Sequence, residues 1–461
     1  MKLRRDSSVN GITEGVIWKE ILIFFFPILF GTFFQQLYNT VDAMVVGRFV
    51  GSTALAAVGG ATGNLVNLLV GFFVGLSSGA TVIIAQFWGR RDFSGVSRAV
   101  HTAIAFSVVG GLGIMVLGIT LSRTILTWMN TPEDMMDASV SYLRIIFAGL
   151  IPSLIYNIGS GILRAVGDSR RPLWFLIVSS LTNVALDLLC VCVLHMGIEG
   201  AAFATILSQA VSAALVLITL RRSETAIHLN WKDVRLHGDT LLDIVKIGLP
   251  TGLQSVMYSL SNIFLQTAVN SFGTITLAAN TAYGKLDGLY WMISGAFGVT
   301  ITTFVGQNFG AKKFDRMFRC VRITLLMALA NTVLLCALLF FGGQFLIPLF
   351  TDDPQVLAEA IHICRNMCWF FVLHVPMSIL SGTLNGTGDT LAPMIISATA
   401  ICVLRVLWVW IVVPHVTSIL GVLQSYPVTW TAGSVMLTIY YLPKKWLERR
   451  KKAAGYLEES K

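Results

Sequence analysis

Polar side chains that could bind a cation lie inside segments that are otherwise apolar. In each of three segments they share one helical face: Gln35, Tyr38, Asn39 and Asp42; Ser180, Asn183 and Asp187; Thr205 and Ser208. Carboxylate, amide and hydroxyl oxygens suit a hard monovalent cation, and two neighbouring carboxyls can carry a proton. The pattern predicts an H⁺ or Na⁺ site at Asp42, Asn183, Asp187 and Thr205. The alternative is that these groups only hydrogen-bond neighbouring helices.

The segments that hold these residues are long enough to cross a membrane. Of the 461 residues, 55% are hydrophobic and only 12% charged, whereas a soluble domain has about 25% charged residues. We therefore expect an all-α polytopic membrane protein, with helices that cross about 30 Å of hydrocarbon and that tilt or bend where they are longer. The twelve predicted spans are 20–47, 54–80, 99–121, 138–160, 173–194, 199–220, 241–271, 275–304, 320–349, 357–384, 391–413 and 419–442.

The basic residues predict the orientation of these helices. Most of the 33 Lys and Arg residues fall in the two terminal tails and in alternate loops, and cytoplasmic loops retain such residues. We expect both termini in the cytoplasm and the protein in the cytoplasmic (inner) membrane. The net charge of +9 predicts attraction to anionic membrane lipids, with no nucleic-acid partner. The seven cysteines do not predict a disulfide framework.

An internal repeat relates the two halves of the chain. Adding 221 to a residue number matches separated motifs in the two halves: Gly161, Gly167, Asp168 and Pro172 with Gly382, Gly388, Asp389 and Pro393; Gln86 and Gly89 with Gln307 and Gly310; Arg144 with Arg365. We predict bundles at 1–220 and 241–445, joined by a cytoplasmic linker at 221–240 and followed by a basic tail at 446–461. With six spans in each, the bundles are related by an axis along the membrane normal.

The predicted cation site belongs mainly to the first bundle. By position along their helices Asp42, Asp187 and Thr205 lie about 8 to 10 Å below the outer surface, at 1.5 Å per residue. In the second half Asn262 takes the place of Asp42, and Trp408 stands at the offset of Asp187. The other ionisable groups within second-half spans, Lys285, Asp287 and Arg405, could neutralise one another as a structural pair.

Further polar and aromatic residues predict where a substrate binds. They occur in both halves of the chain: Gln35, Tyr38, Asn39, Tyr142, Asn157, Gln254, Tyr258, Asn262 and Asp287. No catalytic residue is expected, because His101, His362 and His374 lack metal-ligand spacing. The GDSRRP and GTGDTLAP segments lack the Lys-Ser/Thr signature of a phosphate loop. We expect no cofactor apart from the coupling ion, and a monomer.

Several of these motifs together resemble one transporter family. They are P-x7-Q-x2-YN-x2-D-x4-G from Pro27 to Gly47, GSTALAA with its counterpart GTITLAA, the Gln86 and Gln307 loops, and the paired GD-x3-P loops. Over residues 15–445 the chain resembles the multidrug and toxic compound extrusion (MATE) transporters. The resemblance implies twelve helices in a V-shaped pair of bundles, and antiport of a cation against drug-like molecules.

Within that family the chain looks most similar to the DNA-damage-inducible (DinF-type) prokaryotic branch. That resemblance implies a first-bundle site at Asp42, Asn183 and Asp187, with Gln35 and Thr205 in the same network. It departs from the other bacterial branch, which carries an acid where Tyr258 stands here. The resulting prediction is H⁺- or Na⁺-coupled export of cationic or amphipathic small molecules, and not an enzyme. The alternative is a flippase for lipid-linked oligosaccharides or lipid precursors.

Overall fold

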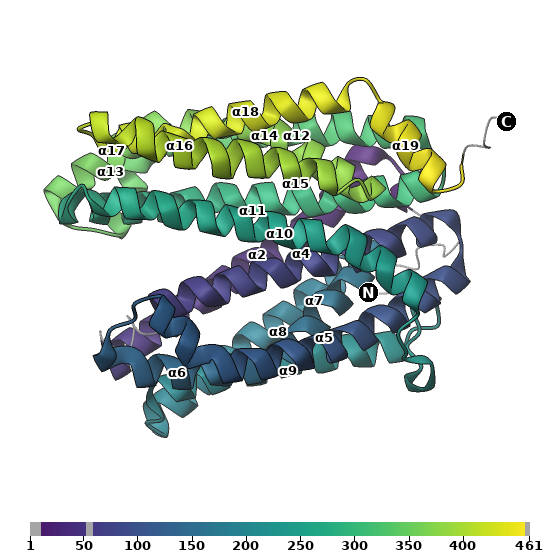
Figure 1. Cartoon of the computed structure of the whole chain (residues 1–461), viewed down its shortest axis with the longest axis horizontal. Helices are drawn as coiled ribbons and strands as arrows, with labels where there is room; N and C mark the ends of the chain where they lie inside the picture. Colours follow the sequence, from purple (N-terminus) through teal and green to yellow (C-terminus); the bar gives the residue numbers. More distant parts are fainter. Residues whose placement is uncertain (1–10, 52–58, 457–461) are drawn as a thin grey trace. The chain divides into compact units, whose positions relative to one another are not determined.

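The computed structural model describes residues 11–51 and 59–456, and within these ranges the chain is almost entirely helical and has no strand (Figure 1). Residues 52–57 of the GSTALAA motif lie outside the described ranges, as do Lys2, Arg4 and Arg5. The all-α prediction is therefore confirmed.

Helices of the first half coincide with the predicted spans. They are α2 (Ile17–Val45) continued by the π-helix η1 (Val46–Val50), α4 (Ala61–Arg90), α5 (Phe93–Trp128), α6 (Glu133–Ala148) with α7 (Leu150–Ala165), α8 (Arg170–Asp187) continued by the π-helix η2 (Leu188–Val193), and α9 (Gly197–Arg221). A short helix α1 (Gly11–Glu14) precedes them. The predicted start of the second span, from residue 54, lies outside the described residues.

The second half repeats this arrangement. Its helices are α10 (Gly238–Asn270), α11 (Thr274–Gly310), α12 (Phe314–Leu346), α13 (Pro354–Met367) with α14 (Phe371–Thr387), α15 (Leu391–Ser397) joined through the π-helix η6 (Ala398–Val403) to α16 (Leu404–Ile411), α17 (Ile419–Leu423) with α18 (Ser425–Tyr441), and the basic α19 (Lys445–Ala453). Within the described ranges nine helical stretches are long and apolar enough to cross a membrane individually, or ten if α6 and α7 form one span.

Local signals explain where some of these helices bend and begin. The chain bends by 46° between α6 and α7, at Gly149. Asp92 caps α5 by accepting a hydrogen bond of 2.9 Å from the Gly95 amide. That bond, together with one from the Ser94 hydroxyl, holds the pKa of the Asp92 carboxyl below its usual range.

The described chain forms two compact units. The N-unit comprises Ile23–Gly252, and the C-unit comprises residues up to Leu22 together with those from Leu253 onward. Helices α2 and α10 therefore each contribute residues to both units. The domain boundaries derived from the sequence remain a prediction.

Close backbone packing holds the N-unit together. Helices α4, α5, α7, α8 and α9 run along one axis (Figure 1), and α4 packs on α7. A side chain at Gly75 or Gly79 of α4 would collide with the backbone of α10 at Gly252 or Gly248. The glycine stripe of α4 is thus a close-packing surface, as small residues at helix interfaces usually are.

In the C-unit, α11 packs on α14 and α14 packs on α18 (Figure 1). The rings of Tyr290 and Phe371 stack with their centroids 4.3 Å apart. The N-terminal segment also belongs to this unit: Arg316 donates from Nε to the Ile12 carbonyl over 3.1 Å, and Lys313 donates from Nζ to the Thr13 carbonyl over 3.1 Å.

The paired GD loops have the same conformation in both halves. Gly167 and Gly388 have φ angles of 97° and 84°, a region open mainly to glycine. The amides of Asp168 and Asp389 then bond back to the preceding helices over 2.9 and 3.0 Å. These loops are helix C-caps of the same type, which explains why the motif recurs.

Candidate functional site

Asp42, Asn183 and Asp187 come together inside the N-unit. Asp187 is 0% exposed and Asn183 is 1% exposed, while Asp42 is partly buried. The carboxyls of Asp42 and Asp187 are close enough to interact electrostatically. Both carboxylate oxygens of Asp187, both amide atoms of Asn183 and Oδ1 of Asp42 are buried without a hydrogen-bond partner among the described residues.

The helices around these residues bring them to one level. Asn183 and Asp187 are one turn apart on α8. The Ser179 hydroxyl donates to the Ser208 carbonyl over 2.8 Å and ties α8 to α9. Gly31 lets α2 lie close to the Leu176 side chain of α8. The three helices named by the polar pattern therefore do share one site.

Two tyrosines and a glutamine complete the cluster. Tyr38 interacts with Gln35, Asp42 and Gln209, and Tyr142 lies within electrostatic range of both acids. The sequence reasoning missed Gln209, whose Oε1 is also buried without a partner. Gln209 lies one turn after Thr205 on α9, and this spacing could have placed it in the predicted site.

Three predicted residues use their polar groups locally. The Thr205 hydroxyl donates to the Ala201 carbonyl over 3.0 Å, which leaves its oxygen lone pairs available to a cation. Asn39 is exposed and bonds Gln36 over 3.4 Å. Asn157 donates to the backbone of its own helix over 2.8 Å. The hydrogen bonds of Asn39 and Asn157 are thus made within their own helices and not with the acidic cluster.

The chemistry of the cluster is that of an acceptor site. Buried carboxylate and carbonyl oxygens without donors favour a bound cation or a proton. Across the ranges 11–51 and 59–456 no group of three or more His, Cys, Asp or Glu is placed to hold a metal ion. The ligands available to Na⁺ are thus the mixed set of two carboxyls, an amide oxygen and a hydroxyl.

The second-half residues predicted for substrate binding lie in the C-unit. Gln254 donates to the Ser397 hydroxyl over 2.7 Å, and the Tyr258 hydroxyl lies 3.9 Å from the sulfur of Met377. Asp287 on α11 accepts a bond of 2.8 Å from the Trp291 indole. Each of these three residues therefore has its own partner within the C-unit.

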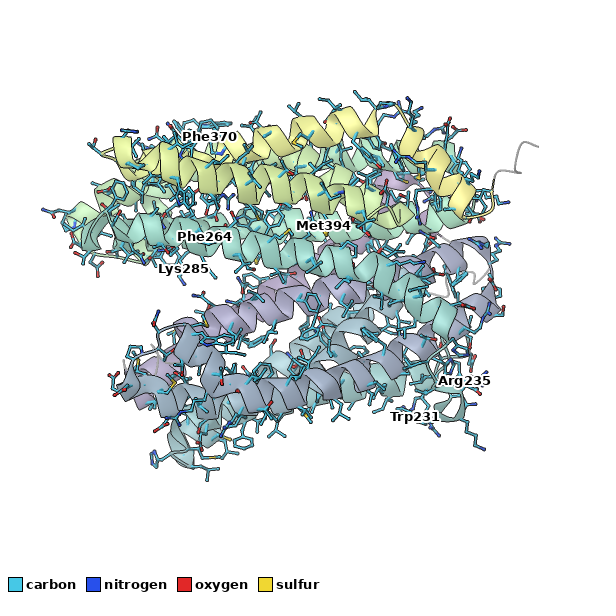
Figure 2. The ribbon with its side chains drawn as sticks, viewed as in Figure 1. Trp231, Arg235, Phe264, Lys285, Phe370 and Met394 are labelled. Carbon is cyan, nitrogen blue, oxygen red and sulfur yellow. The ribbon has the colours of Figure 1, made fainter. Side chains whose placement is uncertain are left out.

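The idea that second-half charges neutralise one another is wrong for the groups described. Asp287 accepts from an indole, and Arg405 bonds the amide oxygen of Asn262 over 2.8 Å. Lys285 is exposed and extends from α11 (Figure 2). None of these three residues takes part in an ion pair among the described residues.

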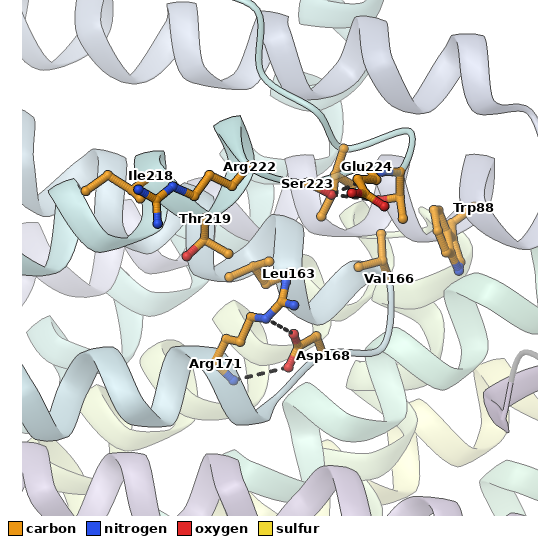
Figure 3. Close-up of a pocket in the computed structure, with 12 residues that line it drawn as sticks. Trp88, Leu163, Val166, Asp168, Arg171, Ile218, Thr219, Arg222, Ser223 and Glu224 are labelled. Carbon is orange, nitrogen blue, oxygen red and sulfur yellow. Dashed lines mark hydrogen bonds and ion pairs between the residues drawn. The ribbon is translucent and has the colours of Figure 1, made fainter. Parts of the chain in front are cut away.

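A separate cavity of about 580 Å³ opens near the GD loop of the N-unit (Figure 3). It is lined by Trp88 and by residues where α7 ends, α8 begins and α9 ends, including an ion pair of 3.3 Å between Arg171 and Asp168. Arg171 and Asp187 lie at opposite ends of α8, which places the cavity roughly 24 Å from the acidic cluster at 1.5 Å per residue. No predicted site residue lines it.

Comparison with known proteins identifies the family. The MatE family model matches residues 27–189 and again 250–411. The chain is 30% identical to the probable multidrug resistance protein YoeA of Bacillus subtilis, over 92% of this chain and 93% of that protein. It is 24% identical to the probable multidrug resistance protein NorM of Thermotoga maritima, over 94% of each.

Solved structures agree on the fold. A crystal structure of MATE in the bent conformation aligns with a TM-score of 0.88 at 22% identity, covering 96% of this chain and 98% of that one. The family model matches the chain twice, once in each half, as the repeat of 221 residues predicts. The chain belongs to the MatE family, that of the multidrug and toxic compound extrusion transporters.

Proposed function

We propose that the protein is a cation-coupled antiporter that exports drug-like, mostly cationic or amphipathic small molecules. The coupling ion is H⁺ or Na⁺, and no further cofactor takes part. The protein works as a monomer in the cytoplasmic membrane with both termini in the cytoplasm. Its relatives named as multidrug resistance proteins support export as the activity, and no catalytic step is needed.

The observation that carries this proposal is the group of unpartnered acceptors in the N-unit. Asp187 and Asn183 are almost fully buried, and their side-chain oxygens accept no bond from the described protein. Two carboxyls in such a place either share a proton or bind a cation, because two bare charges close together repel. A group that changes its occupancy in this way can couple ion movement to transport.

The lipid-precursor flippase has less support. Binding a pyrophosphate calls for several cationic side chains, and the described spans of the C-unit offer only Arg405 as a buried cation. The acidic cluster of the N-unit favours cationic substrates instead.

A reconstituted system tests the proposal. The purified protein in liposomes, with an imposed Na⁺ or H⁺ gradient, should move ethidium against its own gradient. A collapsed ion gradient should stop this movement. Equal ethidium movement with and without either gradient would contradict coupled antiport.

A further inference from the structure

Arg405 is a buried cation that forms no ion pair with any described residue. It lies on α16 and is 1% exposed, among the largest fully buried side chains of the protein. Its Nη1 donates to Oδ1 of Asn262 over 2.8 Å and its Nη2 to the hydroxyl of Thr429 over 3.4 Å. Both acceptors are neutral. The Nε atom has no acceptor among the described residues.

This arrangement leaves the charge of the guanidinium unmatched. A buried charge is costly unless an opposite charge and hydrogen bonds compensate it. The contacts of Arg405 with Asn262, Thr429 and the face of the Tyr426 ring, 4.5 Å from the centroid, supply only partial compensation. The fork of N–H donors matches a carboxylate, which accepts two parallel bonds. The missing partner is therefore an anion.

Aromatic side chains surround this position. Tyr426 and Trp430 lie with their ring centroids 5.3 Å apart, and Trp430 lies 6.0 Å from Trp291. Trp430 is 2% exposed, and its indole Nε1 is a second buried donor without an acceptor. Tyr426 is only partly buried, so an aromatic molecule could pack against this ring while its acceptor group meets the guanidinium.

The site is close to the surface of the C-unit. Asn262, whose amide oxygen covers the guanidinium, is itself exposed. Nη1 can therefore donate to a new partner if the Asn262 side chain turns away. Next to this aromatic group, Asp287 accepts a bond of 2.8 Å from the Trp291 indole.

Backbone irregularity also marks this position. The described residues contain three π-helical segments, η1, η2 and η6. The first two follow Asp42 and Asp187, and the third ends just before Arg405. Such segments are frequent at functional sites. A π-helical segment thus lies next to the acids of the N-unit and next to the arginine of the C-unit.

We propose that the C-unit holds a subsite, centred on Arg405, for the carboxylate of an aromatic substrate. The carboxylate bonds the guanidinium in place of Asn262, and the substrate's aromatic rings pack on Tyr426. This inference rests on the proposed export function, but its test measures binding alone.

A matched pair of dyes tests the subsite. Rhodamine 110 carries a free carboxylate, and rhodamine 123 is its methyl ester with the same ring system. In fluorescence polarisation with the purified full-length protein, Arg405→Gln should weaken rhodamine 110 binding about tenfold or more, the size expected for a lost charged hydrogen bond. Rhodamine 123 binding should change less than about twofold. Arg405→Lys, which keeps the charge but not the fork, should fall between.

Lys285→Gln is the control, because it removes an exposed cation from α11 of the same unit. It should change neither affinity. Equal weakening of both dyes by Arg405→Gln, no weakening of rhodamine 110, or the same effect from Lys285→Gln would overturn the subsite.

Wild-type protein keeps the inference testable if Arg405→Gln does not fold. Binding of rhodamine 110 should then be displaced by 2-naphthoate and not by 2-naphthamide, and equal displacement by both would refute a carboxylate site. Asp42→Asn separates this inference from export: it should stop coupled efflux and preserve the dependence of rhodamine 110 binding on its carboxylate. If wild-type protein fails to transport but shows that dependence, only the proposed function fails.

Discussion

At Asp42, a coupling role and a structural role predict different outcomes. The side chain interacts with Asp187 and Tyr38, and one of its oxygens has no partner among the described residues. We expect Asp42→Asn to reduce gradient-driven efflux at least about tenfold, because the amide keeps the size but cannot exchange a proton or neutralise Na⁺. The measurement is ethidium efflux from proteoliposomes with matched amounts of folded protein.

Asp137→Asn provides the control for this variant. Asp137 is an exposed acid that pairs with Arg123 over 3.3 Å, and its removal should leave efflux unchanged. Efflux by Asp42→Asn at the wild-type rate would show that Asp42 is only a structural residue.

Asp187 should determine how transport depends on pH. Because its carboxyl interacts with that of Asp42, the two titrate as a pair and the loss of one changes the apparent titration of the other. We expect Asp187→Asn to shift the pH profile of efflux as well as to lower the rate. A lower rate with a pH profile that superimposes on the wild-type one would indicate that the acids do not communicate.

The sequence contained part of this site but not all of it. Helical spacing identified Asp42, Asn183 and Asp187, because a charged or amide side chain stands out in an apolar span. It missed Gln209, because a single polar residue on α9 can be assigned to the site only when its neighbours in the structure are known. It also misread Arg405, because spacing does not reveal whether a cation has a counter-charge.

At the scale of the helices, apolar length predicted where helices form, because every predicted span overlaps a helix of the structure. The α6 and α7 pair, the π segments and the short α1 were not predicted, because such breaks depend on packing partners and capping bonds. In α4, Gly75 and Gly79 allow a close approach to the backbone of α10, a contact that depends on the partner helix.

The contact of Gly79 gives a prediction about stability. Gly79→Ala should destabilise the protein by about 1 to 3 kcal/mol, the usual cost of overpacking a tight contact. The reason is that a methyl group at this position would collide with backbone atoms of Ile244 and Gly248, which cannot move aside. The measurement is the thermal unfolding midpoint in detergent.

Gly113→Ala is the matched substitution, since a Cβ at that exposed position in α5 meets no atom within 4 Å. It should leave the midpoint unchanged or slightly raised, because alanine favours a helix over glycine. Equal midpoints for the two variants would rule out the tight contact.

At the scale of the whole molecule, the two halves repeat one another in sequence but differ in their buried charged residues. The two halves share GD loops of the same geometry and the same family match. Among the described residues, the charged side chains that are fully buried differ between the units: Asp187 in the N-unit and Arg405 in the C-unit. The repeat offset was readable from the sequence, whereas the membership of residues up to Leu22 in the C-unit was not, because it depends on long-range contacts.

This asymmetry predicts that cation and cationic substrate compete for the N-unit. A single acidic cluster compensates one positive charge at a time, so each ligand should lower the affinity of the other by the same factor. Exclusive loading also lets the ion gradient drive export. A potential of about 100 mV supplies about 2.3 kcal/mol per charge and a tenfold gradient about 1.4 kcal/mol more. For one cation exchanged against a neutral substrate, these allow accumulation on the order of several hundredfold.

Titration of ethidium binding tests this competition. With the purified protein in detergent, raising Na⁺ or lowering the pH should weaken ethidium binding, and ethidium should weaken binding of the coupling ion in equal measure. The carboxyl, amide and hydroxyl oxygens of the cluster suit either ion. The ion that weakens ethidium binding is therefore identified as the coupling ion. Asp42→Asn should remove this linkage while Asp137→Asn keeps it. Ethidium affinity that stays constant across both titrations would mean that ion and substrate do not share the acidic cluster.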